Sequence, residues 1–453
     1  MPRPLLFSAF VMNTASHILH GLWRRPDAEQ TRFNELRLWM DLAMSLERGM
    51  FDVLFFADVH GVYGPTGSSF RKHVEAGLQI PSNDPAAIVS ALASCTEHLS
   101  FAFTSSVVQE HPFSFARKLS TLDHASDGRV AWNIVTNGIP NGARNFGYDD
   151  LTPHDERYTW AEEYMEVVYK LWEGSWDEGA LLQDRTRGIH GDPARVHRID
   201  HVGPRYRVEG PHLCAPSPQR TPLLFQAGSS PTGMRFAAAH AEAQFLIAPS
   251  PAVAASVIAA TRALLPEFGR SNDDIRFFQG LSFVIGSTEA EVARLDRELD
   301  LAIDHEAMIT HLGGVMGIDL GRVSLDQPIT TLETEGAKSL LDWVRAAVTD
   351  REPTVRDISL LASRSSRVSG TPEHIADQLE RWQASGIDGI NVVNATIPGS
   401  YDDFIEHLMP VLRRRGLARE NYAPGSLRRK LFGHDRLPAN HPGAACRGMF
   451  SER

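Results

Sequence analysis

The stretch Ser120–Thr136, STLDHASDGRVAWNIVT, indicates how this chain folds. It begins inside a predicted helix, Pro112–Ser126, whose apolar residues recur at helical spacing. It ends in Val130–Val135, an apolar and β-branched run that predicts a buried strand. The carboxyl end of this strand carries three polar residues, Asn133, Thr136 and Asn137. Because ligands of parallel β/α proteins bind at that end, we expect these residues on the floor of an active site.

The same alternation of helices and buried strands extends to both sides of this stretch. We predict eight strands, at Leu5–Val11, Val53–Phe56, Leu99–Val107, Val130–Val135, Pro222–Ala227, Gln244–Ala248, Ile275–Ile285 and Ile390–Val393. Nearly all are continuous apolar runs, which indicates strands that are buried on both faces. The fold class is therefore predicted as α/β, an eight-stranded parallel β/α (TIM) barrel.

Helices are predicted between these strands, at Thr31–Glu47, Pro85–Glu97, Pro112–Ser126, Tyr158–Leu171, Ser230–His240, Pro251–Leu265, Ala290–Leu301, His374–Ala384 and Tyr401–Arg414. On the first helix, periodicity places five side chains toward the core: Leu36, Trp39, Met40, Ala43 and Leu46.

The chain is longer than a barrel needs. Its 453 residues exceed the usual ~250 of a β/α barrel, so we expect one barrel domain over 1–453 with added segments. The predicted additions are an insertion at 173–220, an insertion at 305–371 and a C-terminal extension at 416–453. We interpret 305–371 as a lid over the barrel mouth, with Gly313-Gly314 as a flexible point.

Composition excludes several classes of partner. The net charge of −11 repels nucleic acid and anionic lipid, and no apolar run approaches the ~18 residues that span a bilayer. We therefore expect neither nucleic acid nor membrane as a partner. Three scattered cysteines are too few for a disulfide framework, so we expect a cytoplasmic protein.

Asp58 and His60 follow a predicted strand, and His17 follows another, so these side chains are candidates for a metal site. A metal-dependent hydrolase using His17, Asp58 and His60 is one alternative function. Other strand ends carry hydroxyls and amides instead, as at Thr104 and Asn133. Such groups bind a neutral organic ligand better than a catalytic dication, so we expect no metal.

Gly228-Ser229-Ser230 lies between a predicted strand and the next helix, where free backbone N–H groups and hydroxyls converge. This arrangement suits a phosphate, although serines also cap helices for purely structural reasons. His154 and Tyr158 are four residues apart at the start of another helix, so both project from one face. They are candidates to complete the phosphate site, or simply to form an ordinary first helical turn.

Different short motifs are distributed in order along nearly the whole chain. They lie at 12–17, 20–24, 46–52, 57–58, 121–124, 128–133, 144–147, 154–158, 170–176, 216–222, 226–228 and 398–402. In this order and spacing they resemble the bacterial-luciferase-like flavin monooxygenases. The similar branch includes the nitrilotriacetate, dibenzothiophene-sulfone, dimethyl-sulfide and long-chain-alkane monooxygenases.

The resemblance implies a two-component enzyme that receives FMN as FMNH2, by diffusion, from a separate NAD(P)H:FMN reductase. With O2 as co-substrate, it would hydroxylate or oxidatively cleave a small organosulfur, alkane or amine substrate through a flavin hydroperoxide. The implied cofactor-binding residues are Ala57, Asp58, Thr104, Asn133, Asn137, His154, Tyr158, Gly228, Ser229 and Ser230. The implied catalytic residues are His17, Tyr63, Gln79 and His311. Relatives suggest a homodimer or homotetramer.

Thr14 and Gly138 depart from the alkane-type pattern, which has Cys and His at these positions. The resemblance therefore implies the reaction class more strongly than the substrate. A deazaflavin-dependent oxidoreductase on the same barrel is a further alternative.

Overall fold

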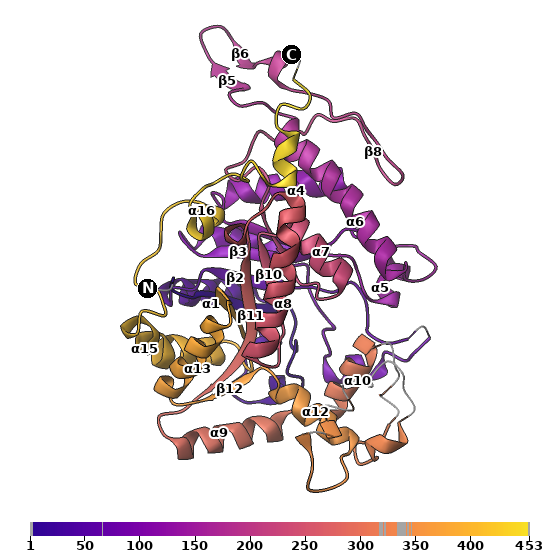
Figure 1. The fold of residues 1–453 in the computed structure, drawn as a ribbon, viewed down its shortest axis with the longest axis vertical. Helices are drawn as coiled ribbons and strands as arrows, with labels where there is room; N and C mark the ends of the chain where they lie inside the picture. Colours follow the sequence, from indigo (N-terminus) through magenta and orange to yellow (C-terminus); the bar gives the residue numbers. More distant parts are fainter. Residues whose placement is uncertain are drawn as a thin grey trace.

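The computed structural model describes residues 3–65, 67–316, 320, 323–332, 341, 344–345 and 347–451. All eight predicted strands are present: β1 (Leu6–Met12), β2 (Val53–Ala57), β3 (Ser100–Ser106), β4 (Val130–Val135), β9 (Leu223–Gln226), β10 (Ala243–Leu246), β11 (Arg276–Ile285) and β13 (Gly389–Val393). They pair in parallel in the order β10-β9-β4-β3-β2-β1-β13-β11, and β10 also pairs with β11. This last pairing closes the barrel, so the predicted fold class is confirmed (Figure 1).

The barrel interior is filled by side chains from alternate strand positions. Five phenylalanines dominate it: Phe10, Phe55, Phe225, Phe245 and Phe278. The ring centroids of Phe10 and Phe55 are 5.4 Å apart, and Phe225 contacts Phe55 edge-on at 5.3 Å. Such packing is favourable beyond the apolar area that it buries. The barrel is thus a solid core whose open space lies only at its ends.

Helices cover the outer face of the barrel. The main ones are α1 (Leu36–Arg48), α3 (Ala86–Ser94), α4 (Pro112–Ala125), α6 (His154–Tyr169), α7 (Pro231–His240), α8 (Pro251–Leu264), α9 (Glu289–Ala302) and α13 (Pro372–Ala384). The helix predicted at Tyr401–Arg414 is α14 (Gly399–Asp403) and α15 (Met409–Arg414), joined by a π-helical turn. Shorter helices are α2 (Arg71–Ala76) and α5 (Pro140–Asn145).

The first helix differs from its prediction. Gln30–Arg32 forms a separate 3₁₀ turn, and α1 begins only at Leu36. Leu36, predicted to face inward, is 41% exposed, whereas Leu38 and Leu42 are buried. The prediction was wrong here because Leu36 lies in the first helical turn, ahead of the part of the helix that contacts the barrel.

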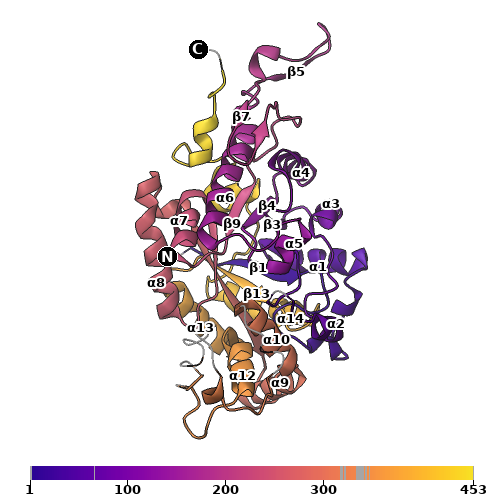
Figure 2. The ribbon, with the colours of Figure 1, turned by 90° about the vertical axis from the view of Figure 1, so that its right-hand side faces the viewer.

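The predicted insertions contain additional elements. Two small hairpins lie within 173–220: β5 (Leu181–Asp184) with β6 (Ile189–Gly191), and β7 (His201–Val202) with β8 (Arg207–Val208). The β5–β6 hairpin forms an arm that projects from one end of the molecule, whereas β7 lies beside α6, where His201 is 3.4 Å from Glu163 (Figure 2).

The segment 305–371 contributes α10 (His305–Met316) and α12 (Val355–Arg364), and parts of it lie outside the described residues. The segment is not entirely an insertion, because β12 (Arg367–Gly370) pairs with β11 as a ninth strand of the sheet. Sequence missed β12 because RVSG contains no apolar run. Gly313 and Gly314, predicted as a flexible point, lie inside α10.

The C-terminal extension packs against the N-terminal end of the barrel. Leu427 and Leu431 of α16 (Leu427–Phe432) join the interior apolar cluster. Between them, Arg428 is fully buried and pairs with Glu242 through bonds of 2.6 and 2.8 Å. Its guanidinium also donates to the carbonyl of Thr221 at 2.9 Å. No helix among the described residues is long and apolar enough to cross a membrane.

Substitution of Arg428 tests whether its buried ion pair with Glu242 stabilises the fold. We expect Arg428→Met to lower the free energy of unfolding by about 3–5 kcal/mol, because it leaves the Glu242 carboxylate buried and unpaired. Arg429→Met is the matched control, since Arg429 pairs with Asp435 at the exposed surface; its cost should be at most about 1 kcal/mol. Denaturant unfolding measures both. Equal stability of the two variants would contradict the proposed role of Arg428.

Candidate active site

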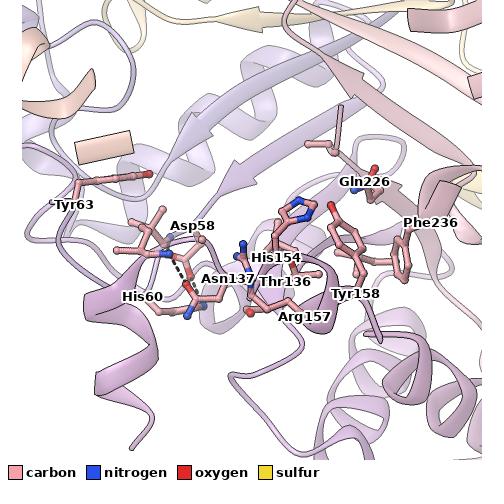
Figure 3. A pocket seen from close by; sticks show the side chains of 18 of the residues that line it. Asp58, His60, Tyr63, Thr136, Asn137, His154, Arg157, Tyr158, Gln226 and Phe236 are labelled. Atoms are coloured by element: carbon pink, nitrogen blue, oxygen red, sulfur yellow. Dashed lines mark hydrogen bonds and ion pairs between the residues drawn. The ribbon is translucent and has the colours of Figure 1, made fainter. Parts of the chain in front are cut away.

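A cavity of about 450 Å³ opens at the carboxyl ends of the strands. Its walls come from the segments that follow β2, β4 and β9, from the first turn of α6 and from Phe236 of α7 (Figure 3). The lining includes six of the predicted site residues: Asp58, Tyr63, Asn137, His154, Tyr158 and Gly228. Residues far apart in sequence therefore converge as their positions at strand ends predict.

One corner of this cavity is built from the start of α7. Ser230 caps the helix, and its Oγ accepts a hydrogen bond of 3.0 Å from the N–H of Gly233. The Nε2 atom of His154 lies 3.2 Å from the same Oγ. A helix N-terminus flanked by hydroxyl and imidazole groups is suited to an oxyanion. We call this corner, formed by His154, Tyr158, Gly228 and Ser230, the cradle.

Tyr158 and two glycines close the cradle. A Cβ atom added at Gly228 would lie 2.7 Å from the Tyr158 hydroxyl, and one added at Gly233 would lie 2.8 Å from it. Any larger residue would displace the tyrosine, so glycine is required at both positions. Ser229, predicted with this set, is exposed on the same turn.

Arg157 is a lining residue that sequence reasoning missed. Its guanidinium is half-buried, and its Nε atom has no hydrogen-bond partner among the described residues. Burial lowers the pKa of Arg157, yet an arginine remains charged at neutral pH. The signal was present, because Arg157 lies inside the His154–Tyr158 motif. Thr136, Gln226 and Phe236 also line the cavity.

Asp58 lies across the cavity from the cradle (Figure 3). Burial raises the pKa of its carboxyl to about 7, although the N–H of Val59 donates to Oδ1 at 2.8 Å and opposes the shift. His60 Nε2 is 3.9 Å from Asp58 Oδ2, and burial lowers the His60 pKa. The carboxyl is thus able to gain or lose a proton near neutral pH.

The metal alternative requires a third ligand beside Asp58 and His60. Across the described residues, no three or more histidine, cysteine, aspartate or glutamate side chains are grouped so as to hold a metal ion. His17 therefore does not complete a triad with Asp58 and His60, and the geometry does not favour the hydrolase alternative.

The four predicted catalytic residues lie together beside this cavity. The ring of His311, on α10, is 4.6 Å from that of Tyr63, and Gln79 Nε2 donates to the carbonyl of His17 at 3.0 Å. The ring centroid of His20, a residue outside the predicted catalytic set, is 4.7 Å from that of His311.

These histidines are neutral. Burial, with a smaller contribution from the charge of His311, lowers the pKa of His17 to about 3, and burial lowers that of His311 to about 4. The Nδ1 atom of each ring is buried without a partner among the described residues, which leaves it available to a ligand.

Ala57, Thr104 and Asn133 belong to the strands themselves and are not part of the cavity lining. Asn133 Nδ2 donates to Thr104 Oγ1 at 2.9 Å, and both side chains are buried. Asn133 Oδ1 has no partner among the described residues. Ala57 ends β2, and Asn137 adopts a positive φ of 59° while its Oδ1 accepts from the N–H of Ile139. Of these two amide oxygens, Asn133 Oδ1 is thus the one without a partner among the described residues.

Comparisons with known proteins agree with this geometry. Residues 12–389 match the luciferase-like monooxygenase family. The chain is 41% identical to the dimethyl-sulfide monooxygenase of Hyphomicrobium sulfonivorans over 99% of this chain and 95% of that protein. A crystal structure of a long-chain alkane monooxygenase has a TM-score of 0.90 at 40% identity, covering 99% of this chain and 100% of the other.

A further similar structure is a riboflavin lyase crystallised with modified FMN and riboflavin. Its TM-score is 0.87 at 35% identity, and the match covers 98% of this chain and 100% of that one. These matches confirm the resemblance inferred from the ordered motifs.

The raised pKa of Asp58 predicts a pH-dependent stability. Because its pKa is about 7 in the folded protein and 3.8 as the ordinary value, folding binds a proton between these pH values and stability falls as pH rises through them. Asp58→Asn removes this loss. From pH 4 to pH 8, the free energy of unfolding of the variant should rise by about 2–4 kcal/mol relative to that of the wild type, as measured by urea unfolding. Asp149→Asn, at an exposed carboxylate, is the control, and an equal response in both variants would contradict the assignment.

Proposed function

The chain belongs to the luciferase-like monooxygenase family, and on that basis we propose that it uses FMNH2 and O2 to oxidise a small organic substrate. In this proposal a separate NAD(P)H:FMN reductase supplies the reduced flavin by diffusion. The cradle is the observation that carries it. The imidazole of His154 and the phenol of Tyr158 line the cavity, and the Ser230 hydroxyl at the N-terminus of α7 lies 3.2 Å from that imidazole.

The described residues fit FMN at both ends of the cavity. His154, Tyr158, Ser229 and Ser230 would hold the phosphate, and Arg157 would neutralise its charge. Glycine at 228 allows the Tyr158 hydroxyl and the Gln226 amide to approach this turn, because a Cβ atom there would lie 2.7 Å from the hydroxyl and 2.3 Å from Gln226 Nε2. Arg157 Nε, beside the cradle, and Asn133 Oδ1, at the other end, have no partners among the described residues, which indicates that a polar ligand completes them.

The isoalloxazine ring would lie between these ends. Ala57, Asp58, Thr104, Asn133 and Asn137 would contact it, and Gly228 would border its phosphate tail. When bound and reduced, the flavin supplies the chemistry that activates oxygen. The riboflavin lyase, similar to this chain over nearly all of both chains, supports FMN as the flavin.

The protein's part in catalysis is to position the substrate, control protons and exclude water. His17 and His311 would act as neutral imidazoles, each with a free Nδ1 atom, and donate or accept a hydrogen bond beside the reacting centre. Tyr63 would orient the substrate; burial raises its pKa to about 12, so it remains a hydrogen-bond donor. Gln79 would hold the His17 segment in place through its bond to the His17 carbonyl.

Helix α10 supports the proposed role of 305–371 as a lid. Gly314 lines the cavity, and a Cβ atom at this position would lie 2.5 Å from the Tyr63 Cβ. The helix therefore packs directly on a proposed catalytic residue, where it shields the site from water.

The substrate class proposed is organosulfur, alkane or amine. Similarity to a dimethyl-sulfide and to a long-chain alkane monooxygenase supports small, mostly apolar molecules. We further propose a cytoplasmic homodimer or homotetramer. The three cysteines are free, and the projecting arm exposes the apolar side chains Leu181, Leu182 and Ile189.

The cradle is tested by its serine and tyrosine. The double substitution Tyr158→Phe, Ser230→Ala should weaken anaerobic binding of FMNH2 by about 10- to 100-fold, because it removes two hydrogen bonds to a charged group. Ser250→Ala is the matched control: Ser250 caps α8, also ahead of a proline, outside the lining of this cavity. Its affinity should be unchanged. Equal affinity in all three proteins would contradict the proposal.

The reaction is tested by substrate-dependent turnover. With a flavin reductase and NADH, a screen of organosulfur compounds, alkanes and amines should give product for at least one class. With that substrate, His311→Asn should reduce product by at least about tenfold while releasing more H2O2, because proton control is lost. Mass spectrometry and a peroxide assay measure the two outputs. His374→Asn, on the barrel's outer helix α13, is the control. Loss of both product and peroxide would contradict this role for His311.

A further inference from the structure

A second cavity, of about 620 Å³, lies at the opposite end of the barrel from the active site. Its walls include the residues that begin β1, β11 and β13, namely Leu6, Arg276 and the segment before Gly389. The C-terminal extension closes one side through Lys430 and Leu431 of α16. Catalytic residues of β/α barrels lie at the other rim, so this space has no part in the proposed oxidation.

The charge of this cavity opposes that of the whole chain. Five cations line it, Arg3, Arg262, Arg276, Arg419 and Lys430, against the two carboxylates Asp273 and Asp388. The chain as a whole carries a net charge of −11. A concave, low-dielectric surface focuses such a local positive field and concentrates anions.

Several of these cations are incompletely neutralised. Arg262 stacks over the ring of Phe277 at 5.3 Å, and its Nε atom is buried without a hydrogen-bond partner among the described residues. Arg276 is 6% exposed and lies 3.9 Å from Asp388, which is at the limit of an ion pair. Lys430 donates to a neutral group, the carbonyl of His98, at 2.6 Å.

The two carboxylates offset only part of this positive charge, since their ion pairs with Arg276 and Arg3 are long, at 3.9 and 3.7 Å. Asp388 accepts from the backbone N–H of Phe277 at 3.0 Å, and Asp273 lies 3.7 Å from Arg3 at the exposed rim. Arg419 pairs with Asp52 at 2.8 Å. Arg262 and Lys430 line the cavity, and neither forms an ion pair with a carboxylate of the described residues, so an incoming anion would neutralise their charge.

We propose that this cavity binds a small phosphorylated anion, with a phosphate or pyrophosphate group held by Arg262, Arg276 and Lys430. The planar fork of arginine matches a phosphate in two-point geometry, and lysine adds a point charge. Amide side chains at the same wall, Asn272, Gln383 and Asn421, supply further donors for the rest of the ligand. The volume exceeds that of a single phosphate, so an organic phosphate fits the space.

Lys430 gives this site a proton signature. Burial, together with the charges of Arg129 and Arg419, lowers the pKa of Lys430 to about 8. An anion beside the ammonium stabilises its charged form and raises that pKa. Binding near pH 8 should therefore take up protons, and the apparent heat of binding should change with the ionisation enthalpy of the buffer.

Isothermal titration of the whole protein with pyrophosphate tests the proposal. Because pyrophosphate also suits the cradle, the titration uses the Tyr158→Phe, Ser230→Ala protein as background. We expect saturable binding there, weakened by about tenfold or more when Arg262→Gln is added. Arg297→Gln, at an exposed arginine of α9, is the matched control and should leave affinity unchanged.

A second variant covers the case in which Arg262→Gln does not fold. Arg3 lies at the exposed rim, so Arg3→Gln should fold normally and weaken binding by a smaller factor, about twofold to fivefold. Absence of saturable binding at millimolar pyrophosphate in the cradle-variant background would overturn the proposal. Binding that neither cavity substitution changes, or that takes up no protons near pH 8, would overturn it as well.

Discussion

The parallel pairing of β10 with β11 closes the sheet, and the site depends on this closure. Once the strands form a ring, their carboxyl ends all meet at one rim, and residues from distant parts of the chain must lie together. Asp58 after β2, Thr136 after β4 and Gly228 after β9 line one cavity for this reason.

Polar atoms without hydrogen-bond partners indicate what kind of ligand this rim binds. A buried, unsatisfied donor or acceptor costs roughly 1–3 kcal/mol, and folded proteins contain few of them. Several gather here, on His17, His311, Asn133 and Arg157. Arg157 lines the cavity and the other three lie on segments around it; together with the helix N-terminus of α7 they suit a long polar ligand with a charged tail. The free-energy cost of these unpaired groups is one that a bound ligand would remove.

The buried strands and the cradle were predictable from sequence because each is a local signal. Continuous apolar runs predicted all eight barrel strands, and a serine–proline pair after Ala227 predicted the capped helix start. β12 could not be predicted this way, since its four residues contain one apolar side chain and depend on β11 for pairing. Arg157 lay inside a recognised motif, but only the folded geometry shows that its guanidinium lines the cavity. The burial of Arg428 against Glu242 joins residues 186 positions apart, which no local pattern reveals.

A crystal structure of the protein soaked with FMN tests the central claim most directly. The account predicts a phosphate bonded to Ser230, His154 and Tyr158, with the ring against Asp58 and Asn133. Flavin seated outside the cavity, or bound with its phosphate pointing away from the start of α7, would contradict it.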